Sequence, residues 1–154
     1  MKSRSIALTA LFTTLYIIIG YALSSIAFLE YQVRVADALY PLIAIFGLPA
    51  LIGTTIGHFT LNLASPLGLI DLLSVALFIP AKIAIWKFGL KAVPLHIISV
   101  ALWVPYMLCT VFQIPFIAYI PLAVTVGVGE TIAEAVIGIP LALAIRKRLG
   151  KVIG

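Results

Sequence analysis

Charged side chains are scarce in this sequence of 154 residues, of which Lys, Arg, Asp and Glu together make up 10%. A typical soluble domain carries roughly 25%. Hydrophobic residues make up 64%, and the mean hydropathy is +1.26. This composition excludes a soluble globular domain, a disordered tail and a disulfide-stapled secreted module. Cys109 is the single cysteine, so an intramolecular disulfide is excluded as well.

Long stretches without any charged residue are present instead. They cover residues 5–29, 38–70 and 92–129 and last 25, 33 and 38 positions. About 20 apolar residues are enough to cross a bilayer. We therefore predict an all-α membrane protein, a single domain over residues 1–154 that is a bundle of six transmembrane helices.

Turn signals divide these stretches into the six predicted spans. Span one runs from about Ser5 to Phe28, which is longer than the ~7–15 apolar residues of a signal peptide, so it is predicted to be retained. Gly47-Leu48-Pro49 separates two short spans of about 14–16 residues, which are either tilted or re-entrant. Further breaks at 65–68, 87–94 and 113–115 lead to a sixth span from about Pro121 to Ile145.

The positive charges indicate how the bundle lies in the membrane. With six spans and both termini in the cytoplasm, nine of the ten Lys and Arg residues fall on the inner side, and only Arg34 falls outside. The net charge of +5 is thus a topology signal and not a nucleic-acid-binding surface.

Polar side chains within the predicted spans are the candidate functional residues, because an ionisable group costs several kcal/mol in the bilayer. At 1.5 Å per helical residue, Trp103 and Glu130 lie about 13–14 Å from the outer face, near the middle of the core. The shallower candidates, at about 3–9 Å, are Asp37, Asn62, Asp71, His58 and Tyr106. This asymmetry indicates a pocket that opens to the outside.

Each of these residues also has a purely structural interpretation. Asp37 and Arg34 are one helical turn apart and can pair near the interface, and His58 and Asn62 can hydrogen-bond across helices. No second ligand stands at metal-binding spacing from His58, so no metal site is predicted.

Trp103 and Tyr106 can be ordinary interfacial aromatics. Glu134 and Lys82 are expected to neutralise each other in the inner half, which leaves Glu130 free for a ligand. His96 is expected near the inner loop, far from His58.

Two motifs carry a resemblance to a known family. The stretch Tyr31–Leu42 reads Y-Q-V-R-V-A-D-A-L-Y-P-L, and Val126–Glu130 reads V-G-V-G-E before Gly138-Ile139-Pro140-Leu141. Both are similar to the QueT family of queuosine-precursor transporters, in which the first motif is Q-F-R-V-S/A-E/D-A-L. Asp37 replaces the commoner Glu, and Val33 replaces the aromatic residue. The resemblance covers essentially the whole chain.

The resemblance implies a six-helix substrate-binding S component of an energy-coupling factor (ECF) importer. Such a chain captures a 7-deazaguanine-type queuosine precursor outside the cell and needs no cofactor of its own. Its partners are the lipid bilayer, a transmembrane T protein and two ATPase subunits. Small residues on the first helix contact the T protein in such components, and here they are Ala7, Ala10 and Thr14, not a strict Ala-x-x-x-Ala.

The side chains match that ligand in chemical terms. A deazaguanine has an N–H beside an exocyclic amine, and the Glu130 carboxylate can accept both bonds. Trp103 or Tyr106 can stack on the ring, and the Asn62 amide can donate a hydrogen bond to the carbonyl oxygen of the ring. Asp37 or Asp71 can neutralise an aminomethyl group, whereas a nitrile needs neither, and Arg34 can lie under the outer loop or lock to Asp37.

Three other functions are weighed against this one. An S component for a different small vitamin would have the same architecture and another pocket. A stand-alone ion-coupled carrier would use the buried Glu130 and Glu134, although no inverted repeat is detectable. An intramembrane enzyme is not favoured, because Ser, Thr, His58 and His96 form no recognisable catalytic arrangement.

Overall fold

The computed structural model describes residues 3–23, 34–65 and 67–153, and within these ranges it contains helices and turns but no strand. The helices fall into an N-terminal group and a C-terminal group along the chain. The first comprises α1 (Ser3–Ala22), η1 (Val35–Leu42), α3 (Ile43–Phe46) and α4 (Leu48–Asn62). The second comprises α5 (Leu69–Phe88), η2 (Gly89–Ala92), α6 (Val93–Val111), η3 (Phe116–Ala118), α7 (Tyr119–Glu130), η4 (Thr131–Gly138) and α8 (Ile139–Ile153). The all-helical prediction is confirmed.

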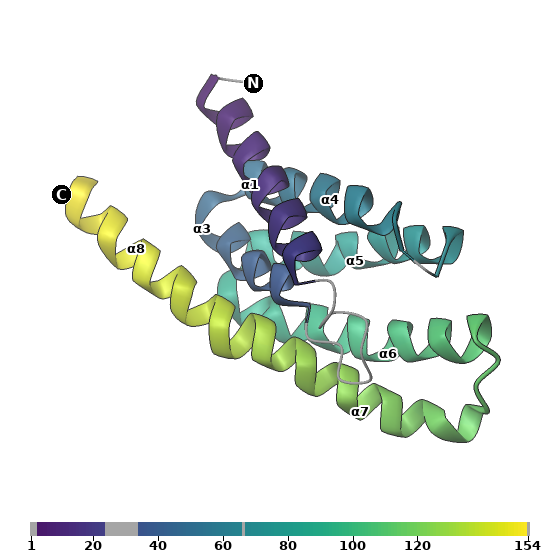
Figure 1. Cartoon of the computed structure of the whole chain (residues 1–154). Coiled ribbons are helices and arrows are strands. Elements are labelled where there is room, and N and C mark those ends of the chain that lie inside the picture. Colours follow the sequence, from purple (N-terminus) through teal and green to yellow (C-terminus); the bar gives the residue numbers. More distant parts are fainter. Residues whose placement is uncertain (1–2, 24–33, 66, 154) are drawn as a thin grey trace.

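Two helical hairpins dominate the arrangement (Figure 1). α4 runs antiparallel to α5, and α6 runs antiparallel to the continuous rod formed by α7, η4 and α8. The two hairpins are close together at the α5–α6 connection and diverge toward the end that carries residues 63–65 and 112–118. α1 packs on α4, and η1 packs on both α1 and η4. The molecule is therefore wedge-shaped in outline, and we call the end at which the hairpins diverge the open end; side chains fill the space there, because Leu67 and Ile70 pack against the same core as Trp103 and Leu108.

Close packing of α1 on α4 depends on two glycines one turn apart. A Cβ atom on Gly53 would lie 2.6 Å from the backbone oxygen of Thr9, and a Cβ on Gly57 would lie 2.7 Å from the Cβ of Tyr16. Because the backbones approach this closely, the Thr13 hydroxyl donates a hydrogen bond of 3.1 Å to the Gly53 carbonyl. The Gly-x-x-x-Gly step therefore serves packing within this chain.

Glycines in the left-handed region form the sharp turns between helices. Gly47 has φ +65° between α3 and α4, and Gly89 has φ +72° at the end of α5. Backbones with positive φ favour glycine, and Pro49 stands at the first turn of α4, where no amide hydrogen is needed. The predicted breaks at 47–49 and 87–94 are confirmed at these positions.

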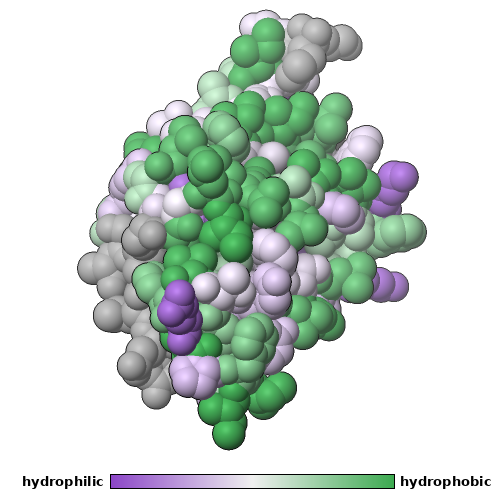
Figure 2. All heavy atoms as spheres, turned by 90° about the vertical axis from the view of Figure 1, so that its right-hand side faces the viewer, coloured by the Kyte–Doolittle hydropathy of each residue, from purple (hydrophilic) through white to green (hydrophobic). Residues whose placement is uncertain are grey.

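The surface and the helix lengths fit a lipid environment. Three helical stretches are long and apolar enough to cross a membrane: Ser3–Ala22, Leu69–Val111, which contains the turn at Gly89, and Phe116–Leu149. Figure 2 shows the open end of the wedge, where hydrophobic residues cover most of the visible surface. The chain is a helical membrane protein.

The count of six crossings depends on two short segments. Val35–Phe46, made of η1 and α3, has 12 residues, and α4 has 15. The number of crossings therefore stays a prediction. The final helical run extends beyond the predicted span 121–145, because it begins at Tyr119 and continues through the π-helix η4 into α8.

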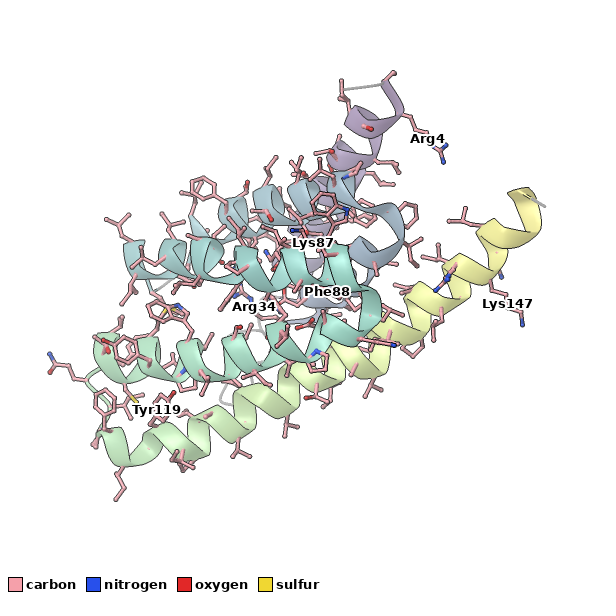
Figure 3. The ribbon with its side chains drawn as sticks, turned by 180° about the vertical axis from the view of Figure 1, so that it is seen from behind. Arg4, Arg34, Lys87, Phe88, Tyr119 and Lys147 are labelled. Carbon is pink, nitrogen blue, oxygen red and sulfur yellow. The ribbon has the colours of Figure 1, made fainter. Side chains whose placement is uncertain are left out.

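Both ends of the described chain lie on the same side of the molecule as the α5–α6 connection, with α1 and α8 projecting away from each other there (Figure 1). Arg4 and Lys147 lie toward this same end of the molecule in Figure 3, and Lys87 stands in the last turn of α5, next to the α5–α6 connection. The open end carries the turns between α4 and α5 and between α6 and α7. Lys82, which the topology prediction counts among the inner cations, is instead buried in the interior, and which side of the membrane the other cations face stays a prediction.

Candidate functional site

Eleven polar side chains are buried where the helices meet, and we call them the polar cluster. Each of them is at most 2% exposed. The members come from all the main helical segments and are Tyr16, Asp37, Tyr40, His58, Asn62, Asp71, Ser74, Lys82, His96, Glu130 and Glu134. Four of the five acidic residues of the chain are among them. Because ionisable groups are rarely buried in membrane proteins without a function, the polar cluster is the candidate functional site.

Asn62 connects α4 to the half-buried Arg34 and to α5. The Arg34 Nη2 donates to the Asn62 Oδ1 at 2.8 Å, and the Asn62 Nδ2 donates to the Asp71 backbone oxygen at 2.9 Å. These two bonds fix which end of the amide is oxygen and which is nitrogen. The same Nδ2 lies 3.1 Å from the His58 Nε2. The His58 Nε2, the Asp71 backbone oxygen and the Ser74 hydroxyl, which lies 3.1 Å away, therefore compete for the two hydrogens of this Nδ2.

A chain of hydroxyl groups continues from His58 to Asp37. The His58 Nδ1 lies 3.3 Å from the Tyr40 hydroxyl, which lies 2.9 Å from the Tyr16 hydroxyl. The Tyr16 hydroxyl donates to the Asp37 Oδ1 at 2.5 Å. Because the one hydrogen of the Tyr16 hydroxyl is donated to Asp37, this hydroxyl accepts from the Tyr40 hydroxyl.

The expected pairing of Arg34 with Asp37 is wrong. Arg34 is bonded to Asn62, and no salt bridge joins it to Asp37 within the described parts of the chain. The Asp37 amide donates to the Arg34 backbone oxygen at 2.8 Å, but the Asp37 side chain is not at the surface. It is buried in η1, which packs between α1 and η4, and there it accepts from Tyr16.

The expected neutralisation of Glu134 by Lys82 is also wrong. The Glu134 Oε1 is 2.7 Å from the His96 Nδ1, and this is the salt bridge found among the described residues. The Lys82 Nζ lies 3.4 Å from the His58 Nδ1 and 4.3 Å from the centroid of the Tyr40 ring. The Tyr40 ring therefore provides a cation–π contact where the sequence suggested a carboxylate.

His96 belongs to the polar cluster, contrary to the expected separation from His58. The centroid of its ring lies 4.5 Å from that of Tyr40 and 5.3 Å from that of Phe78. Phe78 in turn stacks on His58, with 6.0 Å between ring centroids and 15° between the planes. The α5–α6 turn brings Phe78 and His96 together although they are distant along the chain.

Glu130 and Glu134 lie at the junction of α7 with η4. The π-helix packs so tightly on η1 that a Cβ on Gly138 would lie 2.6 Å from the Ala38 carbonyl oxygen. π-Helical turns are rare and occur frequently at functional sites. The packing of η1 on η4 brings the segment that carries Asp37 to this junction.

Several buried polar atoms at this junction have no hydrogen-bond partner among the described residues. They include the Glu130 Oε2, the Glu134 Oε2 and the His96 Nε2, together with the Trp103 Nε1 nearer the open end of the wedge. A buried polar atom without a partner costs about 1–3 kcal/mol. These atoms are therefore candidates for contact with a bound molecule.

Trp103 and Tyr106 lie in a groove outside the polar cluster. Their ring centroids are 5.5 Å apart, Trp103 is half-buried, and Tyr106 is 43% exposed. The groove runs between α5 and α6 and has a volume of about 440 Å³. Its lining residues are Leu77, Phe78, Ser99, Leu102, Trp103, Tyr106 and Tyr119. The structure thus divides the predicted site residues between a polar core and an aromatic groove.

Comparison with known families identifies the chain. A family model described as QueT transporter matches residues 6–147. The chain belongs to the QueT transporter family. No curated protein and no solved structure gave a significant match. Membership of the QueT family makes the chain a transporter and not an enzyme.

The predicted site residues of this QueT transporter are only partly brought together. Asp37, Asn62, His58, Asp71 and Glu130 belong to the polar cluster, and Arg34 is bonded to it. Tyr31, Gln32 and Val33, in the motif that carries the resemblance, lie outside the described residues. Within the described ranges, no group of three His, Cys, Asp or Glu side chains is arranged to hold a metal ion.

Sequence reasoning missed Tyr16, Tyr40 and His96. Tyr16 and Tyr40 look like ordinary aromatic residues of apolar segments, and only their hydroxyl bonds show that they belong to the polar cluster. A usable signal exists for Tyr40, because it lies three residues after Asp37 within the quoted motif. His96 carries no comparable signal, since its partner Glu134 is 38 residues away.

The predicted partner-binding residues lie on the outer face of α1 in this QueT transporter. Ala7, Ala10 and Thr14 are exposed, whereas Phe12 and Tyr16 of the same helix are buried. Ala10 and Thr14 line a shallow groove between α1 and α4. This face is accessible to another membrane helix.

Proposed function

We propose that this transporter is the substrate-binding S component of an ECF importer and captures a 7-deazaguanine-type queuosine precursor from outside the cell. Membership of the QueT family supports the transport role. The observation that carries the proposal is the buried Glu130, whose Oε2 has no partner among the described residues. A carboxylate left unpaired in an apolar helix needs a donor, and the ligand supplies it.

The ligand edge that suits Glu130 has two adjacent N–H donors. In a deazaguanine these are the ring N–H and the exocyclic amine, which one carboxylate accepts as a bidentate pair. Charge-assisted bonds of this kind are roughly twice as strong as neutral ones. The unpartnered Glu134 Oε2 and His96 Nε2 lie at the same junction and extend the set of ligand contacts.

The charge balance of the polar cluster favours a ligand with a positive group. Asp37, Asp71, Glu130 and Glu134 supply four acidic groups, and Lys82 together with the bonded Arg34 supplies two basic groups. An excess of negative charge in a low-dielectric site is costly. An aminomethyl substituent would relieve this excess, whereas a nitrile would not.

The proposed route of capture follows the shape of the wedge. The hairpins diverge at the end opposite the cations Arg4, Lys87 and Lys147 (Figures 1 and 3). If six spans and cytoplasmic termini hold, positive residues face the cytoplasm, and the open end faces outside. The substrate then reaches the buried carboxylates from the external side.

Energy for release is proposed to come from other subunits. The exposed Ala7, Ala10 and Thr14 allow close approach of a helix from the T component, and two ATPases would act through that contact. A stand-alone ion-coupled carrier would need no such face. Uptake of labelled substrate in cells with and without the ECF ATPases separates the two mechanisms, and the proposal predicts uptake only when the ATPases are present.

Ligand identity is tested by thermal unfolding of the purified protein in detergent. A molecule that binds only the folded state raises the apparent stability. We expect stabilisation by 7-aminomethyl-7-deazaguanine, weaker stabilisation by 7-cyano-7-deazaguanine and none by adenine. Stabilisation by a B vitamin instead, with no response to either deazaguanine, would assign the chain to a different substrate.

A further inference from the structure

Every exposed charged side chain in the described parts of the chain is a cation. We call these residues the cationic set, and they are Arg4, Lys87, Lys91, Arg146, Lys147 and Arg148. The four acidic residues that the structure describes all belong to the buried polar cluster, where each is at most 2% exposed. The fifth, Glu30, lies outside the described residues, and one carboxylate cannot balance six cations. Most of their counter-charge therefore comes from outside the chain.

Three separate stretches of the chain bring the cationic set to one end of the molecule. Lys87 stands in the last turn of α5 and Lys91 in η2, so both belong to the α5–α6 connection. Arg4, near the start of α1, and Lys147, in α8, lie toward the same end (Figure 3). The salt bridge found among the described residues lies inside the polar cluster and involves none of these cations. Such a concentration of charge of one sign attracts anions.

Exposed aromatic residues place this end at the boundary of the membrane. Trp86 is 43% exposed and Phe88 is 71% exposed, and they stand on either side of Lys87 in the sequence. Tryptophan is enriched at the level of the lipid headgroups. A Cβ on Gly47 would lie 3.5 Å from the Trp86 Nε1, so the indole stands beside the α3–α4 turn. The lysines of the α5–α6 connection are therefore expected at headgroup level too.

The cations of α8 favour a lipid surface over a protein partner. Arg146, Lys147 and Arg148 are consecutive helical residues, so their side chains point in directions about 100° apart. All three are exposed, and together they cover about 200° of the circumference of the helix. A helix in the headgroup region has phosphates on all sides, so each of the three cations can meet one. A docked protein would cover one side of α8 and leave cations on the other side without counter-charge.

We propose that the cationic set binds the headgroups of anionic phospholipids, so that lipids of this class accumulate around this end of the protein. A phospholipid suits both kinds of side chain at once. Its phosphate pairs with the lysines of the α5–α6 connection, and its acyl chains cover the adjacent exposed aromatic rings. Attraction of this kind acts over a Debye length, about 8 Å at physiological ionic strength. The lipid site is separate from the polar cluster and does not depend on which substrate is carried.

Quenching of tryptophan fluorescence by brominated lipids tests the proposal. Trp86 and Trp103 are the two tryptophans of the chain, so the Trp103→Phe protein reports on Trp86 alone. The purified protein is reconstituted into vesicles of equal parts phosphatidylcholine and phosphatidylglycerol, with bromine on the acyl chains of one lipid or of the other. Because cations near the bilayer surface attract anionic lipids, we expect brominated phosphatidylglycerol to quench Trp86 about twofold or more strongly than brominated phosphatidylcholine.

Trp103 provides the matched control. It lies ten residues after Val93, the first residue of α6, and thus about 15 Å along that helix from the α5–α6 connection. The Trp86→Phe protein reports on this half-buried residue alone. Its quenching should be the same whichever of the two lipids carries the bromine. An equal preference for phosphatidylglycerol at both tryptophans would overturn a site confined to the cationic end.

The dependence on charge completes the test. Replacement of both Lys87 and Lys91 by Gln removes the cations that are nearest to Trp86 in the sequence and should bring the quenching ratio close to one. About 1 M NaCl shortens the Debye length to about 3 Å and should do the same in the protein with both lysines, so the test stands even if the double variant does not fold. Equal quenching of Trp86 by the two lipids at low salt would overturn the proposal and favour an acidic protein as the partner. A preference that either treatment leaves unchanged would also overturn it.

Discussion

Glu130 is the residue on which ligand affinity should depend most. Replacement by Gln turns one carboxylate oxygen into a donor that faces the N–H edge of the ligand. We expect Glu130→Gln to weaken binding of 7-aminomethyl-7-deazaguanine by about tenfold or more, because a hydrogen bond to a charged group is worth about 1.5–3 kcal/mol. Calorimetric titration measures the loss, and equal affinity of the variant would contradict the role.

The His96–Glu134 pair should matter for stability. Glu134→Ala leaves the buried His96 Nδ1 without its acceptor at 2.7 Å, and an unsatisfied buried donor costs about 1–3 kcal/mol. We expect a lower unfolding temperature in detergent. Glu134→Gln retains an oxygen acceptor and should lose much less, so equal losses in the two variants would contradict the bond.

Residue identity alone predicted that these groups are buried together, but it did not predict their hydrogen-bond partners. Asp37, Glu130 and Glu134 were recognisable because a carboxylate in an apolar stretch is costly. Spacing in one helix suggested the Arg34–Asp37 pair, whereas the bonds observed are Tyr16–Asp37 and Arg34–Asn62. Partners that are 21 and 28 residues apart are chosen by tertiary packing, which local spacing does not report.

At the scale of the element, the two glycines of α4 set the distance between α1 and α4. Gly53→Ala would place a Cβ 2.6 Å from the Thr9 backbone oxygen, so the helices must separate. We expect a loss of several kcal/mol in unfolding free energy. Gly127→Ala is the matched control, because its Cβ would meet the Ala101 Cβ at 3.4 Å.

Gly127→Ala should be neutral or slightly stabilising, since Ala is favoured over Gly in a helix by about 1 kcal/mol. Thermal unfolding of both variants in the same detergent provides the comparison. If the two substitutions had equal effects, the close approach of α1 to α4 would not limit stability.

Helices and turns could be predicted from the sequence, whereas the irregular segments could not. The ends of the apolar runs and the glycines at positions 47 and 89 mark the turns between helices directly in the sequence. Nothing in the amino-acid composition of the 3-10 helix η1 or of the π-helix η4 distinguishes these segments from an ordinary α-helix. Their tight contact at Gly138 is visible only when the two segments, nearly a hundred residues apart, are packed together.

At the scale of the whole molecule, topology is the prediction that most needs a test. The buried Cys109 is replaced by Ala, and single cysteines are placed at Gln113, at the open end, and at Lys147, at the end where the cations gather. In intact cells, a membrane-impermeant maleimide should label Gln113→Cys and not Lys147→Cys. Labelling of both positions, or only of Lys147→Cys, would contradict the proposed orientation.

The central claim is that a deazaguanine is held at the buried Glu130 between the two hairpins. A structure of the protein with bound 7-aminomethyl-7-deazaguanine tests this most directly. The account predicts the ring within hydrogen-bond distance of the Glu130 carboxylate, on the polar-cluster side of Phe78. A ligand bound elsewhere, with the Glu130 Oε2 still unpartnered, would contradict it.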